Sequence, residues 1–179
     1  MLRKISAWLL FLGAVAPLSA GADDSLAKFK GGIGVIPVSA GVVPAGQQPL
    51  TSEVVNRNFV RGVPPPGQIW VIAALNADVK TDGSVKVRGK GLLLGGGNGI
   101  GGNANQSVRA TLICDAAGAV LFNTGLVPLE PNGDFRIDDV LRSDTGATPP
   151  NPCASPVLLI RNPAGAWFAA GIPDLSNDD

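Results

Sequence analysis

The chain of 179 residues contains neither histidine nor tyrosine. Imidazole is the usual general base near neutral pH and the commonest ligand of zinc and copper. Its absence therefore excludes Ser-His-Asp and Cys-His catalysis and most sites for those metals. An enzyme would have to rely on carboxylates, lysine or an external metal. The composition predicts a protein that is not an enzyme and has no cofactor.

A surplus of charge is missing as well, because 14 Lys and Arg residues stand against 14 Asp and Glu residues. A chain without a basic excess cannot neutralise many phosphates, so we expect no nucleic-acid partner. The apolar run Ile5–Leu18 is shorter than the about 20 residues that a transmembrane helix needs. We expect no integral membrane segment once this run is removed.

The first 22 residues have the layout of a secretory signal peptide. Arg3 and Lys4 form a positive start, the run Ile5–Leu18 follows, and small residues lead to Ala22 before an acidic pair. Cleavage is predicted after Ala22. The remaining chain is long enough for one domain with a sizeable core. This pattern predicts a secreted or periplasmic protein.

Cysteine is scarce, with only Cys114 and Cys153. In an oxidising compartment an even number of cysteines predicts a disulfide. The bridge would close a loop of about 40 residues and stabilise the fold by about 4 kcal/mol in the chain-entropy model. The spacing excludes a redox CxxC motif, and two thiols without histidine make a poor zinc site.

Glycine and proline punctuate the chain, with 24 and 15 residues, and the apolar residues between them occur in short runs. Such short runs separated by turns predict an all-β, single-domain antiparallel β-sandwich, immunoglobulin-like or jelly-roll-like, with a small β-barrel as the alternative. We expect a mobile or extended N-terminal arm over residues 23–50. The sandwich would span residues 51–173, and a disordered acidic tail would span residues 174–179.

Several strands and turns can be placed individually. The continuous apolar run Ile69–Leu75 predicts a strand that is buried on both faces. Asp82-Gly83 predicts a type I′ hairpin turn, and Asn132-Gly133 is a second hairpin signal. On the strand after the first turn, three cations alternate with inward residues, where they would protect a sheet edge or bind an anionic polymer. These cations are Lys86, Arg88 and Lys90.

The glycine-rich segment Gly95–Asn105 is the first candidate for a binding loop. It contains a G-x-G-x-x-G match, but a dinucleotide site needs a helix to follow, and here a strand pattern follows. The residues that we consider for binding are Gly97, Asn98, Gly99, Asn103 and Asn105. The rigid loop Pro64–Gly67 is the second candidate.

Four aspartates form the densest acidic cluster, and oxygen ligands of this kind suit Ca²⁺. They are Asp134, Asp138, Asp139 and Asp144. Their spacing lacks the EF-hand pattern, so solvated strand ends and turns are the favoured explanation and calcium is the alternative. A pair of carboxylates among them could also serve a glycosidase.

The sequence thus predicts an exported, non-catalytic binding or structural module. Its partner would be a protein or a surface polymer that contacts the loops. The alternatives are a Ca²⁺-dependent or small-ligand domain that binds carbohydrate, and a carboxylate-based hydrolase. Trp70 and Trp167 lie in apolar runs and are expected in the core; an exposed tryptophan would instead offer a stacking platform for sugars.

Overall fold

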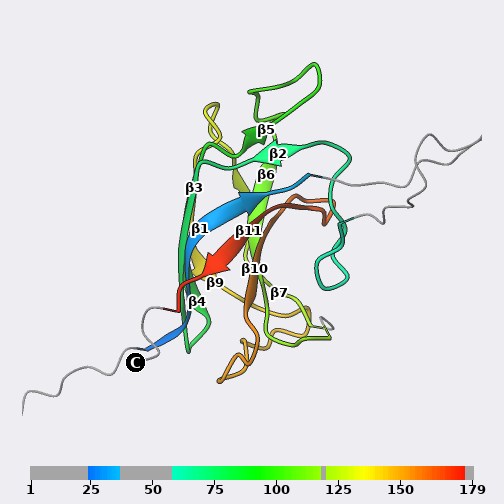
Figure 1. Ribbon diagram of the computed structural model, residues 1–179. Helices are drawn as coiled ribbons and strands as arrows, with labels where there is room; N and C mark the ends of the chain where they lie inside the picture. The colour runs from blue at the N-terminus through cyan, green and yellow to red at the C-terminus, as the bar shows by residue number, and fades with distance from the viewer. Residues whose placement is uncertain (1–23, 37–57, 118–119, 176–179) are drawn as a thin grey trace, which may run out of the picture.

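A computed structural model describes residues 24–36, 58–117 and 120–175. This part of the chain holds eleven strands and no helix, which confirms the predicted all-β class (Figure 1). The strands are β1 (Ser25–Gly34), β2 (Trp70–Val71), β3 (Ala74–Lys80), β4 (Ser84–Lys90), β5 (Leu93–Leu94), β6 (Ser107–Ile113), β7 (Phe122–Asn123), β8 (Val127–Pro128), β9 (Phe135–Val140), β10 (Val157–Arg161) and β11 (Trp167–Pro173).

Nine strands form one antiparallel sheet in the order β7-β6-β10-β11-β1-β3-β4-β9, with β8 paired to β6. The two ends of this sheet meet at Asn123 and Arg142. Asn123 N–H donates to the Arg142 carbonyl at 2.7 Å, and Arg142 N–H donates to the Asn123 carbonyl at 3.0 Å. The sheet is therefore barrel-like and nearly closed, which is consistent with both the predicted sandwich and its barrel alternative. β2 and β5 form a separate two-stranded sheet.

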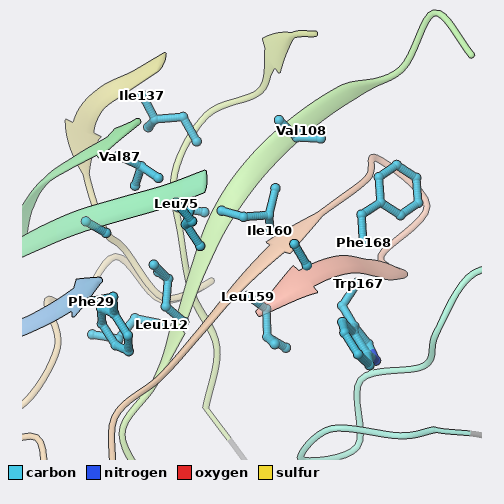
Figure 2. Packing of buried hydrophobic residues seen from close by; sticks show 14 of the residues in the cluster. Phe29, Leu75, Val87, Val108, Leu112, Ile137, Leu159, Ile160, Trp167 and Phe168 are labelled. Atoms are coloured by element: carbon cyan, nitrogen blue, oxygen red, sulfur yellow. The ribbon is translucent and has the colours of Figure 1, made fainter. Parts of the chain in front are cut away.

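Alternation along the strands fills the interior of this sheet. On β4, Val85 and Val87 are buried, whereas Lys86, Arg88 and Lys90 are exposed, as their sequence pattern predicts. Inward side chains from distant strands meet in the same core (Figure 2). Fully buried members include Leu75, Val79, Val87, Leu112, Ile137, Leu158 and Ile160.

A second apolar layer covers the outside of β10 and β11. Figure 2 shows Leu159 and Trp167 on the opposite side of these strands from Ile160. The Trp167 indole N–H donates to the Asn58 carbonyl at 3.0 Å, and the Trp167 backbone N–H donates to the Pro64 carbonyl at 3.0 Å. Trp167 is only 3% exposed, so its predicted place in the core is confirmed.

The structure corrects the predicted N-terminal arm, because part of it is a central strand. β1 lies between β11 and β3, and Phe29 points into the core while Lys30 is exposed. The glycines that suggested a loop are needed for close packing. A Cβ on Gly32 would lie 2.8 Å from the Leu75 Cβ, and one on Gly34 would overlap the Trp70 carbonyl oxygen.

The predicted strand Ile69–Leu75 is also wrong, because the chain bends in its middle. Trp70–Val71 pairs in the small sheet, whereas Ala74 begins β3 in the large one, and Val71 is 47% exposed. The partner strand bends at the same level, where Gly91 has a φ of +62°. The Ala73 N–H closes this bend by donating to the Lys90 carbonyl at 2.9 Å.

The hairpins at the two Gly-containing turn signals form, but the turn type differs from the expected type I′. Gly83 N–H donates to the Lys80 carbonyl at 3.0 Å, and Gly83 has a φ of +87° while Asp82 does not have a positive φ. Asn132-Gly133 repeats this arrangement, with Gly133 N–H donating to Glu130 at 2.8 Å. Both are type I turns followed by a left-handed glycine, a common longer hairpin loop.

The predicted disulfide is present. Cys114 and Cys153 are 39 residues apart in sequence, with their Cα atoms 4.8 Å apart. The bridge joins the end of β6 to the segment that leads into β10. Close by, Ser155 N–H donates to the Cys114 carbonyl at 3.1 Å, which pairs the same two segments.

Some predictions fall on other parts of the chain. The signal peptide (1–22), residues 37–50 of the arm and residues 176–179 of the tail lie outside the described residues. The tail begins at an ordered contact, because the Asp174 N–H donates to the Lys28 carbonyl at 2.8 Å. Over the described ranges, no helix is long and apolar enough to cross a membrane.

Candidate binding groove

The proline loop that the sequence singled out, Pro64–Gly67, is anchored at both ends. The Pro64 carbonyl accepts the Trp167 N–H of β11, and just beyond the loop Trp70 N–H donates to the Val35 carbonyl at 3.0 Å. Proline fixes the backbone between these anchors. The loop is therefore held in one conformation against the sheet.

The glycine-rich loop Gly95–Asn105 is also held by its own hydrogen bonds. Leu94 N–H donates to the Gly102 carbonyl, and Gly101 N–H donates to the Leu94 carbonyl, both at 2.9 Å. The Asn103 amide donates to the Leu129 carbonyl at 3.1 Å, and its side-chain oxygen accepts the Asn105 N–H at 3.0 Å. Asn103 thus fixes the shape of the loop.

The two loops line the same open groove of about 470 Å³. They meet at the end of the molecule that carries β2 and β5, at the top of Figure 1. The groove has an apolar base where the Trp70 and Phe168 rings stack, with centroids 4.0 Å apart and planes 10° apart. The lining residues are Pro66, Gln68, Trp70, Leu94, Asn98, Gly99, Ala104, Gln106, Asn162 and Phe168.

The polar part of the groove consists of four side-chain amides, and no lining residue is ionisable. Gln68 and Asn98 are exposed, and within the described residues neither amide has a hydrogen-bond partner. Asn162 uses its oxygen to accept the Ala166 N–H at 2.9 Å, which leaves its N–H₂ group for other contacts. Each free amide offers both donors and an acceptor. The groove is suited to an uncharged ligand with hydroxyl or amide groups.

Of the five residues proposed for binding, Asn98 and Gly99 line the groove, and Gly97 and Asn103 support its loop. Gly97 has a φ of +74°, and a Cβ there would lie 3.3 Å from the Gln68 side-chain oxygen. Asn105 is exposed outside the lining. Trp70 is 3% exposed, so its predicted core position is confirmed and it offers no open stacking face.

The four aspartates proposed for calcium are dispersed, each with its own contact. Asp134 accepts the Gly91 N–H at 2.9 Å and holds the bend beside β4. Asp138 faces Lys86 across the β4–β9 pair, with the amine nitrogen 3.7 Å from a carboxylate oxygen. In the part of the chain that the structure covers, no three acidic or cysteine side chains gather to hold a metal.

The other two aspartates have similar roles. Asp139 accepts the Gly125 N–H at 2.7 Å. Asp144 acts on Arg161, whose pKa is lowered by burial and by the adjacent Arg109, and the Asp144 carboxylate opposes this decrease. The Asp139 carboxylate is therefore engaged by the backbone, whereas Asp144 is exposed and acts on Arg161 only through its charge.

Sequence reasoning missed most of the groove. Gln68, Gln106 and Asn162 are single polar residues with no motif around them, and they come from three separate segments. Their meeting depends on how the β2–β5 sheet packs over β11.

No protein-family model, curated protein sequence or solved structure matches this chain. Its function therefore has to be inferred from its own residues.

Proposed function

We propose that this chain is an exported, non-catalytic binding module whose groove takes an uncharged ligand of the neutral-oligosaccharide class. The observation that carries the proposal is the meeting of two anchored loops around one groove lined by amides and lacking charge. Amide side chains beside the partly exposed Pro66 and Leu94 match the alternating polar and apolar surface of a sugar chain.

The composition of the groove supports binding without hydrolysis. A glycosidase needs two facing carboxylates, and the lining of this groove contains none. The calcium-dependent alternative needs clustered oxygen ligands, whereas Asp134 and Asp138 are each engaged elsewhere.

Export is part of the same proposal. The disulfide between Cys114 and Cys153 favours an oxidising compartment, and the N-terminal 22 residues have the pattern of a signal peptide. A surface polymer of the cell envelope is then the partner that best combines this location with an uncharged groove.

The test is an NMR titration of the oxidised chain with short neutral gluco-, xylo-, manno- and galacto-oligosaccharides. We expect shifts of the Gln68 and Asn98 side-chain N–H₂ signals with at least one probe. The double variant Gln68→Ala/Asn98→Ala should weaken that binding about tenfold, the effect of losing hydrogen bonds worth roughly 1.4 kcal/mol.

Asn58→Ala is the matched control, because Asn58 is an exposed amide that does not line the groove. It should bind like the unchanged chain. Binding that is insensitive to the double variant, or no binding of any probe, would overturn the proposal. Cleavage of a probe would show that the module is an enzyme.

A further inference from the structure

The outer face of β1, β3, β4 and β9 carries two neighbouring cross-strand rows that differ in charge. The first, the mixed row, consists of Lys28, Asp78, Lys86 and Asp138, which are aligned in register. Charges alternate along it, and Lys86 is 3.7 Å from Asp138. Opposite charges on facing strands stabilise a sheet modestly. The mixed row is therefore explained by the fold itself.

The second, the cationic row, lies two residues further along each strand. It consists of Lys30, Asn76, Arg88 and Arg136, again in register, and all four residues are exposed. Lys90 extends it along β4. Within the described part of the chain, none of these cations forms an ion pair or a side-chain hydrogen bond.

The fold gives no reason for this second row. Protection of a sheet edge is excluded for β4, because β4 lies between β3 and β9. Arg88 also lies directly opposite Arg136. Like charges at this position, about 5 Å apart at Cβ, destabilise the strand pair. An external anion would remove this repulsion.

The face is hollowed where the row crosses β1, β3 and β4. Lys30, Asn76 and Arg88 are among the residues that line a shallow depression of about 330 Å³. Asp78 also lines it, but the Asp78 carboxylate accepts the Ser25 hydroxyl at 2.6 Å and pairs with Lys80 at 3.0 Å. Asp174 lines the depression as well, so its lining holds two carboxylates against four cations and has a net positive charge; the cations are Lys28, Lys30, Lys86 and Arg88.

We propose that the cationic row binds an acidic polysaccharide, with the sugar chain lying across the strands. Because neighbouring strands are about 4.8 Å apart, Arg88 lies about 5 Å from Arg136 and about 10 Å from Lys30. This regular spacing suits the carboxylates that recur along an extended acidic polysaccharide. Guanidinium groups bind carboxylates with two parallel hydrogen bonds. The Asn76 amide, which lies between Lys30 and Arg88 in the row, is placed to bond a sugar hydroxyl.

A nucleic acid fits this face less well. Single strands bind through stacked aromatic side chains in addition to cations, and the aromatic residues of these four strands, Phe29 and Phe135, are buried. The proposal rests on the sheet face alone and is independent of the groove.

The experiment measures retention of the full oxidised chain on immobilised polygalacturonate over a range of ionic strengths. We expect retention that falls as salt rises. Affinity should fall at least tenfold in Arg88→Glu and in Arg136→Glu, because each removes a charge-assisted bond and adds repulsion. Thermal melts check that both variants remain folded.

Arg142→Glu is the control with the same change of charge. Arg142 is exposed and follows β9, about 20 Å along the chain from Arg136. The affinity of the Arg142→Glu variant for polygalacturonate should stay within about twofold of that of the unchanged chain. An equal loss of affinity in Arg142→Glu would show that binding depends only on the net charge of the protein, and it would overturn the proposal. So would the absence of retention, or stronger binding of single-stranded DNA than of polygalacturonate.

Discussion

The groove and the cationic row, the two proposed binding surfaces, are built from different kinds of residues and structure. The groove combines loops, apolar rings and neutral amides such as Gln68 and Asn98, whereas the row stands on regular strands and carries Arg88 and Arg136. Strand register alone spaces the charges of the row. The loops of the groove need dedicated anchors, of which Asn103 is the clearest.

The difference shows what each surface can tolerate. A charge on a sheet face can be replaced without disturbing its neighbours, because the backbone ladder holds the position. A change in the loop anchors alters the position of every group that the loop carries. The two surfaces should therefore respond separately to substitution, unless the whole barrel unfolds.

The largest effect should come from the double variant Cys114→Ala/Cys153→Ala, which tests whether both surfaces belong to one cooperative unit. Loss of the bridge should lower the free energy of unfolding by about 4 kcal/mol in the chain-entropy model. That corresponds to a melting temperature lower by about 10 °C. Calorimetry should show a single transition, and both binding activities should be lost in it. Two transitions would show that the surfaces unfold independently.

The next largest effect should come from a substitution at Gly34, which is expected to weaken binding in the groove but not at the cationic row. Gly34→Ala places a Cβ against the Trp70 carbonyl oxygen, so the β2 segment below the groove must move. We expect a cost of about 3 kcal/mol and weaker groove binding, with polygalacturonate retention unchanged at temperatures where the chain is folded. Gly67→Ala is the control, because a Cβ there would meet no atom within 4 Å. Equal destabilisation by both variants would contradict this account.

These sites also show how far the sequence could lead. The cations of β4 were predicted to share one exposed face, because the period of a strand is local and Val85 and Val87 alternate with them. The disulfide was predictable from the even number of cysteines and the expected oxidising compartment. The two loops were identified as candidates, but their meeting around one groove was not.

Non-local packing explains what the sequence could not reveal. β1 contains glycines that usually indicate a loop, and only the close approach of Leu75 and Trp70 shows why they stand in a strand. Arg136 is 48 residues from Arg88, so the cationic row exists only through the β4–β9 pairing. The bend at Ala73 depends in the same way on Gly91 of the partner strand.

A smaller effect tests the repulsion inside the cationic row. Arg88→Glu replaces a like-charge pair with an opposite pair across β4 and β9, so it should raise the melting temperature by about 1–2 °C. The same variant should lose polymer binding. Differential scanning fluorimetry at low salt measures this gain, and Arg142→Glu should show none. A lower melting temperature for Arg88→Glu would mean that Arg88 supports the fold.

The smallest effect concerns pH and lies away from both surfaces. The pKa of Asp82 is lowered by its hydrogen bonds with Ser84. Its ionised form therefore stabilises the hairpin above the usual aspartate pKa, and this contribution is lost as pH falls through the lowered value. Between pH 5 and pH 2, the melting temperature of Asp82→Asn should decrease less than that of the unchanged chain. Identical pH profiles would show that the hydrogen bond contributes no net stability.

The position of β1 has a consequence for how the chain is assembled. Its two neighbours in the sheet are β3 and β11, and β11 ends at Pro173. The first described strand thus gains its second partner only when the last described strand has emerged from the ribosome. Until then, both Phe29 and the edge of β1 are left uncovered. The sheet around β1 can therefore be completed only after β11, the last described strand, has been synthesised.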